Sequence, residues 1–296
     1  MDTTQAVRTE TEAGVRSIIL CRPDAYNTIT PALRDELAAA IDAADADPDV
    51  HVILLRADGP AFCAGYGLDW STKTQAAEAS RERVWDSVMD MRMTSSFVNV
   101  YMKLWYAAKP TIAAVQGWCI GGGTDMVLCT DIIIAAEGAS FGYPPARVWG
   151  TPTTAMWVYR MGPERAKRYL LTGDEIPAIE AARTDMILEV VPDEQLQQHA
   201  MSFARRMAQL PTNQLVMLKL LCNQTIENMG LSSSRTLGTL FDGIARHTQE
   251  GHDFVSRAKE AGFRQAVRER DDPFGDYGSG PRSRKGKPDM ERKKRG

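Results

Sequence analysis

The stretch KPTIAAVQGWCIGGGTDMVLCTDIIIAAEGASF, residues 109–141, contains two apolar runs separated by a glycine triplet and one acid. The run 111–115 is short and apolar, which is typical of a buried strand. The glycines at 121–123 carry no Cβ, so a ligand can approach their backbone closely. Residues 124–128 resume with helical spacing, which places the triplet at a helix start, where unpaired N–H groups stabilise negative charge. With Asp125 in the first turn, the stretch predicts an oxyanion site with a proton carrier beside it.

A second turn of small residues follows another apolar run. The run 50–55 leads into PAFCAGYGLD, residues 60–69, and so repeats the order of strand and glycine-containing turn. One glycine cluster alone usually marks only a turn, but here two segments match. Together they resemble the crotonase superfamily, which contains the enoyl-CoA hydratases and isomerases, and the resemblance covers roughly residues 15–274. Three further segments match that family: CRPDAYNTIT (21–30), TDIIIAAEGASFG (130–142) and LTGDEIPAIEA (171–181).

The order of predicted elements indicates an α/β core followed by a helical region. A helix over 30–46 is indicated by Thr30 as a cap, by Pro31 in the first turn and by an apolar face. Residues 74–107 are predicted as one or two helices, and helices dominate from residue 153 onward. Strands are predicted at residues 3–9, 15–21, 50–56, 111–115, 132–135 and 187–191.

The resemblance adds an architecture that the pattern alone would not give. It implies a crotonase-like spiral of ββα turns with a helical C-terminal trimerisation region, and hence a homotrimer or a dimer of trimers. We expect the spiral core over residues 1–200, the helical region over 201–276 and a basic, disordered tail over 277–296.

Composition excludes several classes of protein. No run of roughly 18 or more apolar residues occurs, so no membrane span is expected. The N-terminus lacks the basic and apolar regions of a secretory signal. The five cysteines are odd in number and lie in apolar surroundings, which favours reduced thiols and a cytoplasmic protein. No Cys/His group has the spacing of a zinc site, so no metal is expected.

The charge is distributed unevenly along the chain. Residues 281–296 carry eight Arg/Lys and two Asp/Glu, a net +6, which leaves −9 for the rest of the chain, whose total is −3. A basic tail rich in Gly, Pro and Ser is typical of disorder, although it could also contact an acidic surface. We favour a solvated terminus, and because the body is acidic we expect no nucleic-acid partner.

The family resemblance assigns the oxyanion site to two backbone N–H groups. Family members bind an acyl-CoA thioester, form an enolate and hold the thioester oxygen between two amides, which by motif position are those of Tyr66 and Gly122. Such donors are fixed before charge develops, and one of them is worth ~2.7–4 kcal/mol in a transition state. The alternatives are a surface tyrosine and a packing glycine.

The acids of the site depart from the family pattern. Asp125 occupies the place of the first catalytic acid, usually Glu, and the alternative is an acid that only stabilises a helix N-terminus. Hydratases and isomerases have their second Glu in a pattern like FGxPE, but here Pro145 holds that position and cannot transfer a proton. Tyr143 and Arg147 lie close by in the sequence and are candidates to orient water or a substrate oxygen.

CoA recognition also follows from motif position. The loop around Ala25 and Tyr26 matches the adenine-contacting loop, and Ala64 matches a backbone contact to the CoA. Phe254 and Arg257 match an aromatic residue and a base that often contact the CoA of a neighbouring subunit, although Arg257 could equally be an exposed helix charge. The full set of expected substrate and CoA contacts is Ala25, Tyr26, Ala64, Gly65, Leu68, Gly121, Trp149, Phe254 and Arg257.

The resemblance therefore implies an acyl-CoA enzyme of the enoyl-CoA hydratase type. It needs no permanently bound cofactor, since coenzyme A arrives as part of the substrate. Because the second Glu is missing, two alternatives stay open. One is a thioester or carbon–carbon bond hydrolase, or a decarboxylase, with the same oxyanion hole; the other is a non-catalytic acyl-CoA-binding protein.

Overall fold

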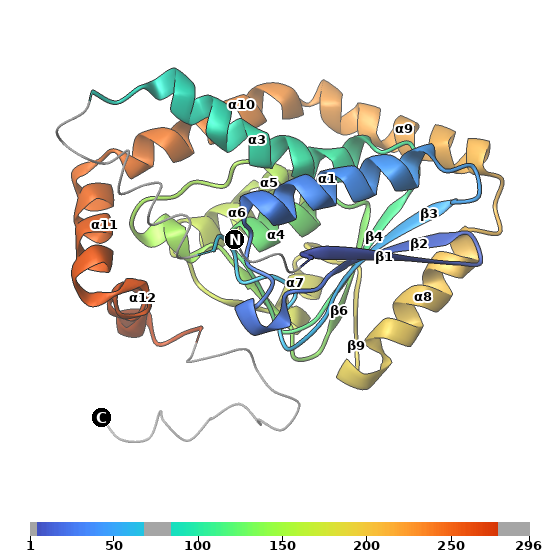
Figure 1. Cartoon of the computed structure of the whole chain (residues 1–296), viewed down its shortest axis with the longest axis horizontal. Helices are drawn as coiled ribbons and strands as arrows, with labels where there is room; N and C mark the ends of the chain where they lie inside the picture. The colour runs from blue at the N-terminus through green and yellow to red at the C-terminus, as the bar shows by residue number, and fades with distance from the viewer. Residues whose placement is uncertain (1–4, 68–83, 278–296) are drawn as a thin grey trace.

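The computed structural model describes residues 5–67 and 84–277 and has two β-sheets, and Figure 1 shows the large one with helices packed around it. The large sheet has the strand order β1-β2-β3-β4-β6-β9, and the small sheet has the order β5-β7-β8. Only the β1–β2 pair is antiparallel in the large sheet; the other pairs are parallel. The strands are β1 (Val7–Glu12), β2 (Val15–Leu20), β3 (Val52–Ala57), β4 (Thr111–Val115), β5 (Trp118–Ile120), β6 (Ile132–Ala136), β7 (Ser140–Gly142), β8 (Ile176–Pro177) and β9 (Glu189–Val191).

From β4 to β7, strands alternate between the two sheets, and β8 and β9 then add one strand to each. β4, β6 and β9 belong to the large sheet, whereas β5, β7 and β8 belong to the small one. Helix α4 (Gly122–Leu128) follows β5, and α7 (Ala178–Arg183) follows β8, so the chain advances as a spiral of strand, strand and helix. This arrangement confirms the predicted fold class, an α/β spiral followed by C-terminal helices.

Helices cover both faces of the large sheet, as Figure 1 shows. Helices α1 (Pro31–Ala46) and α3 (Ser87–Tyr106) pack on the face that presents Ile53 and Leu55, and α8 (Leu196–Met207) packs on the face that presents Val52 and Leu54. The alternation follows from the period of two in a strand. The remaining helices are α5 (Met156–Met161), α6 (Pro163–Leu170), α9 (Thr212–Asn228), α10 (Leu231–Arg246), α11 (Gln249–Ala261) and α12 (Phe263–Asp271).

The predicted ranges agree best with the structure for the elements that have a long hydrophobic pattern. The side chain of Thr30 accepts the Leu33 N–H at 3.2 Å and caps α1 as expected. Within the described part of residues 74–107 the chain forms α3, and residues 68–83 lie outside the described residues. The strand expected at 3–9 is found at Val7–Glu12, and the one expected at 187–191 is shortened to Glu189–Val191.

The three strands of the small sheet were not predicted. They are two or three residues long, too short to show a period, and they form only because β5 and β7 lie side by side. The expected boundary at residue 200 falls inside α8, which packs on the sheet. Among the described helices, none combines the length and the apolar character that crossing a bilayer requires.

Candidate active site

The two glycine-containing turns lie side by side in the structure. The Cys63 N–H donates to the Trp118 carbonyl at 3.0 Å, and the Ile120 N–H donates to the Cys63 carbonyl at 2.9 Å. A Cβ added to Gly65 would lie 3.0 Å from the Ile120 carbonyl oxygen and 3.9 Å from the Gly122 nitrogen. Backbone from two distant parts of the chain therefore meets at Gly65 and Gly122.

Gly122 and Tyr66 are neighbours at this point. Gly122 is the first residue of α4, so its N–H has no acceptor within the helix. A Cβ on Gly122 would come within 2.8 Å of both the Tyr66 ring and the Ile29 side chain, so the site has no room for a side chain there. Tyr66 forms a β-bridge with Ile29, and its hydroxyl accepts a hydrogen bond of 3.1 Å from Tyr101. Residues Tyr66 and Gly122 are thus neighbours in the structure, and their role as oxyanion donors stays a prediction.

Asp125 is buried in the first turn of α4 and fully engaged. Its Oδ2 accepts the Thr153 N–H at 2.9 Å and the Thr153 hydroxyl at 3.1 Å, and its Oδ1 accepts the Trp157 indole N–H at 2.9 Å. Burial raises the pKa of this carboxyl to about 6, and the three hydrogen bonds oppose that rise. A pKa near neutrality suits a group that gives and takes protons. The same bonds tie the segment at Thr153 to α4, so Asp125 also has a structural role.

Pro145 and Tyr143 flank the glycine triplet. A Cβ on Gly121 would lie 3.9 Å from the Pro145 ring, which places the position of the missing second Glu against the triplet. Tyr143 is buried, and its hydroxyl donates to the Thr151 carbonyl at 2.8 Å. Its ring packs edge-on against Trp157, which binds Asp125, with centroids 6.4 Å apart. Tyr143 therefore belongs to the surroundings of Asp125.

Arg147 is engaged elsewhere. Its guanidinium pairs with Asp271 at 3.0 Å and Asp276 at 2.7 Å, and it lies 3.9 Å from the centroid of the Phe274 ring. The side chain is 2% exposed. These contacts fasten the C-terminal segment to the core and favour a structural role over the orientation of water.

The expected CoA loop contacts the first glycine-containing turn. The Ala64 N–H donates to the Tyr26 carbonyl at 3.0 Å, so the backbone around Ala25, Tyr26 and Ala64 forms one surface. Tyr26 adopts φ +49° and is 36% exposed, with its ring 6.0 Å from that of Trp118. An exposed aromatic ring at this place can stack on a planar ligand.

Asn27, which sequence reasoning did not single out, holds this loop in place. Its side-chain amide donates to the carbonyls of Asp58 and Ala61 at 2.9 and 3.0 Å, and its carbonyl oxygen accepts the Arg22 N–H at 2.8 Å. The residue is fully buried at φ +51°. An Asn between turn residues is the available sequence signal, because Asn tolerates a positive φ.

The remaining expected contacts form a cluster on α11 and α12. Phe254 is buried, stacks on Trp149 with centroids 5.7 Å apart and meets Phe263 edge-on. Arg257 forms a bidentate pair with Glu269 at 2.7 and 2.8 Å. Within this chain Phe254 is therefore a core residue and Arg257 joins two helices. Leu68 lies outside the described residues.

Helix α10 brings two charged residues to the site that sequence reasoning did not single out. Arg246, 8% exposed, pairs with Asp242 of the same helix at 2.9 Å and with Asp90 of α3 at 2.5 Å. The Thr239 hydroxyl of α10 donates to the Thr153 carbonyl at 3.4 Å. The helical spacing of these residues on one face was visible in the sequence, but not which way that face points.

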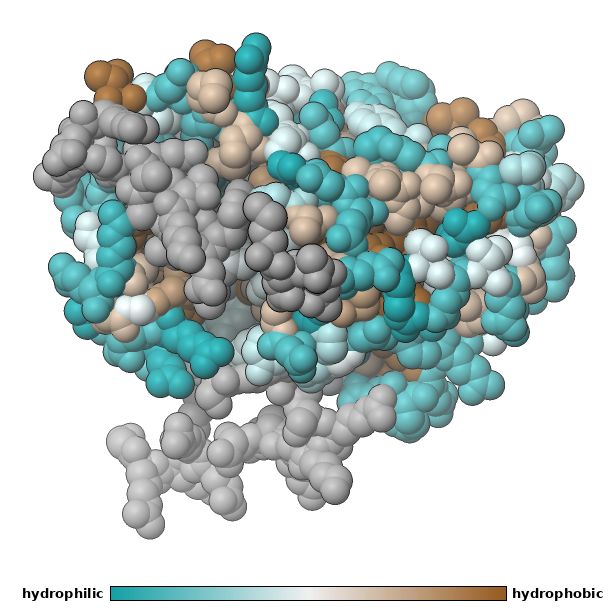
Figure 2. Space-filling view, viewed as in Figure 1, coloured by the Kyte–Doolittle hydropathy of each residue, from teal (hydrophilic) through white to brown (hydrophobic). Residues whose placement is uncertain are grey.

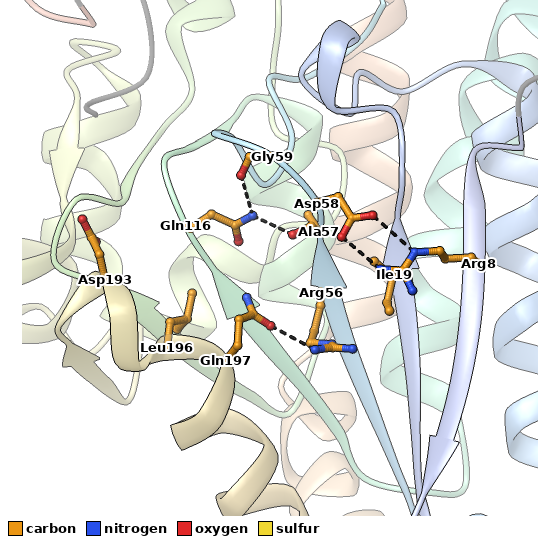
Figure 3. A pocket seen from close by; sticks show the side chains of 10 residues that line it. All are labelled: Arg8, Ile19, Arg56, Ala57, Asp58, Gly59, Gln116, Asp193, Leu196 and Gln197. Atoms are coloured by element: carbon orange, nitrogen blue, oxygen red, sulfur yellow. Dashed lines mark hydrogen bonds and ion pairs between the residues drawn. The ribbon is translucent and has the colours of Figure 1, made fainter. Parts of the chain in front are cut away.

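One pocket of about 240 Å³ lies away from these residues (Figure 3). It opens between the ends of β2 and β3 and helix α8, and none of the predicted site residues lines it. Its arginines already have partners: Arg8 binds Asp58 at 3.1 Å, and Arg56 binds Gln197 at 3.3 Å. We place no active site there. In the described part of the chain, no group of three His, Cys, Asp or Glu residues could hold a metal ion.

Known proteins match the chain over most of its length. The sequence profile described as Enoyl-CoA hydratase/isomerase matches residues 10–261. A crystal structure of an enoyl-CoA hydratase from Mycobacterium smegmatis is 43% identical, with a TM-score of 0.88 over 94% of this chain and 97% of that one. An enoyl-CoA hydratase/isomerase from Xanthobacter autotrophicus Py2 is 29% identical, with a TM-score of 0.83 over 92% and 99%. The hydroxycinnamoyl-CoA hydratase-lyase of Pseudomonas fluorescens is 29% identical over 69% of this chain and 72% of its own. The chain belongs to the enoyl-CoA hydratase/isomerase family.

Proposed function

We propose that the protein is an acyl-CoA lyase of the enoyl-CoA hydratase type, which holds the thioester oxygen between the amides of Tyr66 and Gly122. The observation that carries this proposal is the meeting of the two turns, with a Gly65 Cβ position 3.9 Å from the Gly122 nitrogen. Amides held by two packed turns need no reorganisation when negative charge develops on the oxygen. Coenzyme A enters with the substrate, and we propose no permanently bound cofactor and a cytoplasmic location.

In the proposed reaction the oxygen of a water molecule adds to the β-carbon of an α,β-unsaturated thioester. The π electrons move toward the thioester oxygen, and the two amides stabilise the enolate that forms. A proton then goes to the α-carbon. Asp125 is a candidate for this transfer, because a carboxyl with a pKa of about 6 is present in both forms near neutral pH.

Binding and turnover test this function separately. Calorimetry with acetyl-CoA and longer acyl-CoA thioesters measures binding, and the loss of enoyl absorbance with crotonyl-CoA measures hydration. We expect Asp125→Asn to lower turnover by about 10²–10⁴-fold while CoA binding stays nearly intact. Asp42→Asn is the matched control, since Asp42 is an exposed acid on α1 that pairs with Lys103. A folded protein that binds no thioester in the panel would refute the proposal.

One observation favours a second candidate, a thioester or carbon–carbon bond hydrolase or a decarboxylase. Pro145 lies against the glycine triplet, so the position that supplies the second Glu in hydratases offers no proton-transferring group. Release of free CoA, followed with a thiol reagent, distinguishes thioester hydrolysis from hydration. Binding without turnover of any thioester would instead support a non-catalytic acyl-CoA-binding protein.

We also propose that the protein forms a homotrimer or a dimer of trimers. The support is the apolar surface of α9 and α10, and Figure 2 shows apolar surface at the upper right, where Figure 1 places α9. Sedimentation of the wild type against Leu221→Glu tests this assembly, and a wild-type monomer at micromolar concentration would contradict it. The exposed side chains are Met217, Leu218, Leu220 and Leu221 of α9 and Leu237, Phe241 and Ile244 of α10.

A further inference from the structure

We propose that Asp242 of α10 is a second proton-transferring group of this site, in the role that Pro145 cannot fill. The inference rests on the proposed function and deepens it. It assigns to a C-terminal helix a carboxylate that takes a proton from the water and returns it to the α-carbon of the substrate.

Asp125, the first candidate for proton transfer, is poorly placed to act alone. Asp125 is 1% exposed, and both of its oxygens already accept hydrogen bonds from Thr153 and Trp157. Pro145, beside the glycine triplet, has neither a proton nor a lone pair to offer from its side chain. Addition of water requires a group that takes a proton from the water, so another base is needed close by.

Helix α10 is docked closely on the segment that binds Asp125. The Thr151 hydroxyl donates to the Gly238 carbonyl at 3.1 Å, and a Cβ on Gly238 would lie only 2.6 Å from the Pro152 carbonyl oxygen. The Thr239 hydroxyl reaches the Thr153 carbonyl. Asp242 follows Gly238 by four residues and so lies on the same face of the helix, one turn further along.

The carboxylate of Asp242 has an ion-pair partner but remains partly exposed to solvent. It pairs with the Arg246 guanidinium at 2.9 Å. Arg246 in turn is anchored on α3 by Asp90 at 2.5 Å and by the Thr94 hydroxyl at 3.1 Å. The Asp242 side chain keeps 14% of its surface exposed, so water can reach it.

The charge of Asp242 also acts on other residues of the site. Burial raises the pKa of Tyr66 and of Tyr143, and among the charged groups Asp242 adds most to both increases, ahead of Asp125. Asp242 likewise adds to the pKa rise of Asp125, after burial. Because these charge effects weaken with distance, they agree with the docking of α10 on the segment that binds Asp125.

The charges around Asp242 leave it able to exchange a proton. Burial raises its pKa, Arg246 and the Thr151 N–H lower it, and Asp90 raises it again. The carboxyl groups of Asp90 and Asp242 both pair with the guanidinium of Arg246. Like charges in a buried site disfavour full ionisation, so the group is poised to hold a proton.

The step is balanced without any further reactant. The Asp242 carboxylate takes a proton from water while the water oxygen bonds to the β-carbon and the π electrons move toward the thioester oxygen. When the enolate collapses, the α-carbon takes that proton from the Asp242 carboxyl. Water has then been added whole, and the carboxylate is regenerated.

The test compares Asp242→Asn, Asp242→Glu and Asp90→Asn in the full-length protein. Hydration of crotonyl-CoA and exchange of the α-protons of butyryl-CoA into D₂O, followed by NMR, report proton transfer, and calorimetry with butyryl-CoA reports binding. We expect Asp242→Asn to lower both rates by about 10²–10⁴-fold with binding changed by less than about threefold, and Asp242→Glu to recover part of the loss.

Asp90→Asn separates proton transfer from a merely structural role. It removes a like charge that raises the pKa of Asp242, so the acid limb of the kcat–pH profile should move to lower pH. An unmoved limb, or a wild-type rate for Asp242→Asn in a protein whose wild type is active, overturns the role of Asp242 alone. A folded wild type that shows neither hydration nor exchange overturns the proposed function and the role of Asp242 together.

Discussion

Replacing Asp125 by Asn should change how folding stability depends on pH. The pKa of Asp125 is about 6 in the folded protein, against 3.8 for an ordinary Asp side chain. The folded state therefore binds this proton more tightly than the unfolded state does. Its contribution to stability is fully present below pH ~4 and is lost as the pH rises through ~6. A shift of about two units corresponds to ~3 kcal/mol, since one unit is worth 1.36 kcal/mol.

The assay is urea unfolding of wild type and Asp125→Asn between pH 4 and pH 7.5. The difference between the two free energies of unfolding should change by ~3 kcal/mol across this window, with Asn gaining relative to Asp as the pH rises. A constant cost of ~1–3 kcal/mol should remain at low pH, because the Asn amide must face either the Trp157 N–H or the Thr153 N–H, both of them donors.

Trp157→Phe provides a second test of the same reasoning. It removes one of the hydrogen bonds that lower the pKa of Asp125, so the pH window should move upward. Parallel stability curves for wild type and Asp125→Asn from pH 4 to pH 7.5 would refute the raised pKa. The carboxylate would then be ionised throughout, and its part in proton transfer would need another explanation.

Two further predictions concern the backbone and the C-terminal segment. Gly122→Ala should destabilise the protein by about 1–3 kcal/mol and weaken acyl-CoA binding, because its Cβ would come within 2.8 Å of Tyr66 and Ile29. Thermal unfolding measures the loss of stability, and calorimetry measures the acyl-CoA affinity. An unchanged affinity would contradict the proposed oxyanion site. Arg147→Met should lower the free energy of unfolding by about 3–5 kcal/mol, because it removes the ion-pair partner of Asp276 and leaves Asp271 with Arg270 alone. A loss below about 0.5 kcal/mol in urea would show that these ion pairs do not anchor the segment.

Local patterns of the sequence were sufficient to predict the elements that carry the site. The apolar run of β4, the glycine triplet and Asp125 in the first turn of α4 are all found where they were expected. Thr30 and Pro31 correctly marked the start of α1. The spiral arrangement came from the family resemblance, because the strands that close the small sheet are too short to show a period.

Tertiary contacts decided what the sequence could not show. Arg147 follows Pro145 closely in the chain, yet its guanidinium is drawn to Asp271 and Asp276 near the C-terminus. Phe254 was expected to contact the CoA of a neighbouring subunit, and within this chain its ring stacks on Trp149. Asp242 and Arg246 looked like ordinary charges on an amphipathic helix, and only the docking of α10 on Thr151 reveals that they face inward.

Helix α10 has opposite characters on its two sides. The side with Asp242 and Arg246 packs on the site, while Leu237 and Phe241 remain exposed on the other side. If a second copy of the chain covers Leu237 and Phe241, its binding also fixes the position of α10 and therefore of Asp242 and Arg246. By mass action, specific activity should then fall on dilution, and substrate should in turn favour the assembled form.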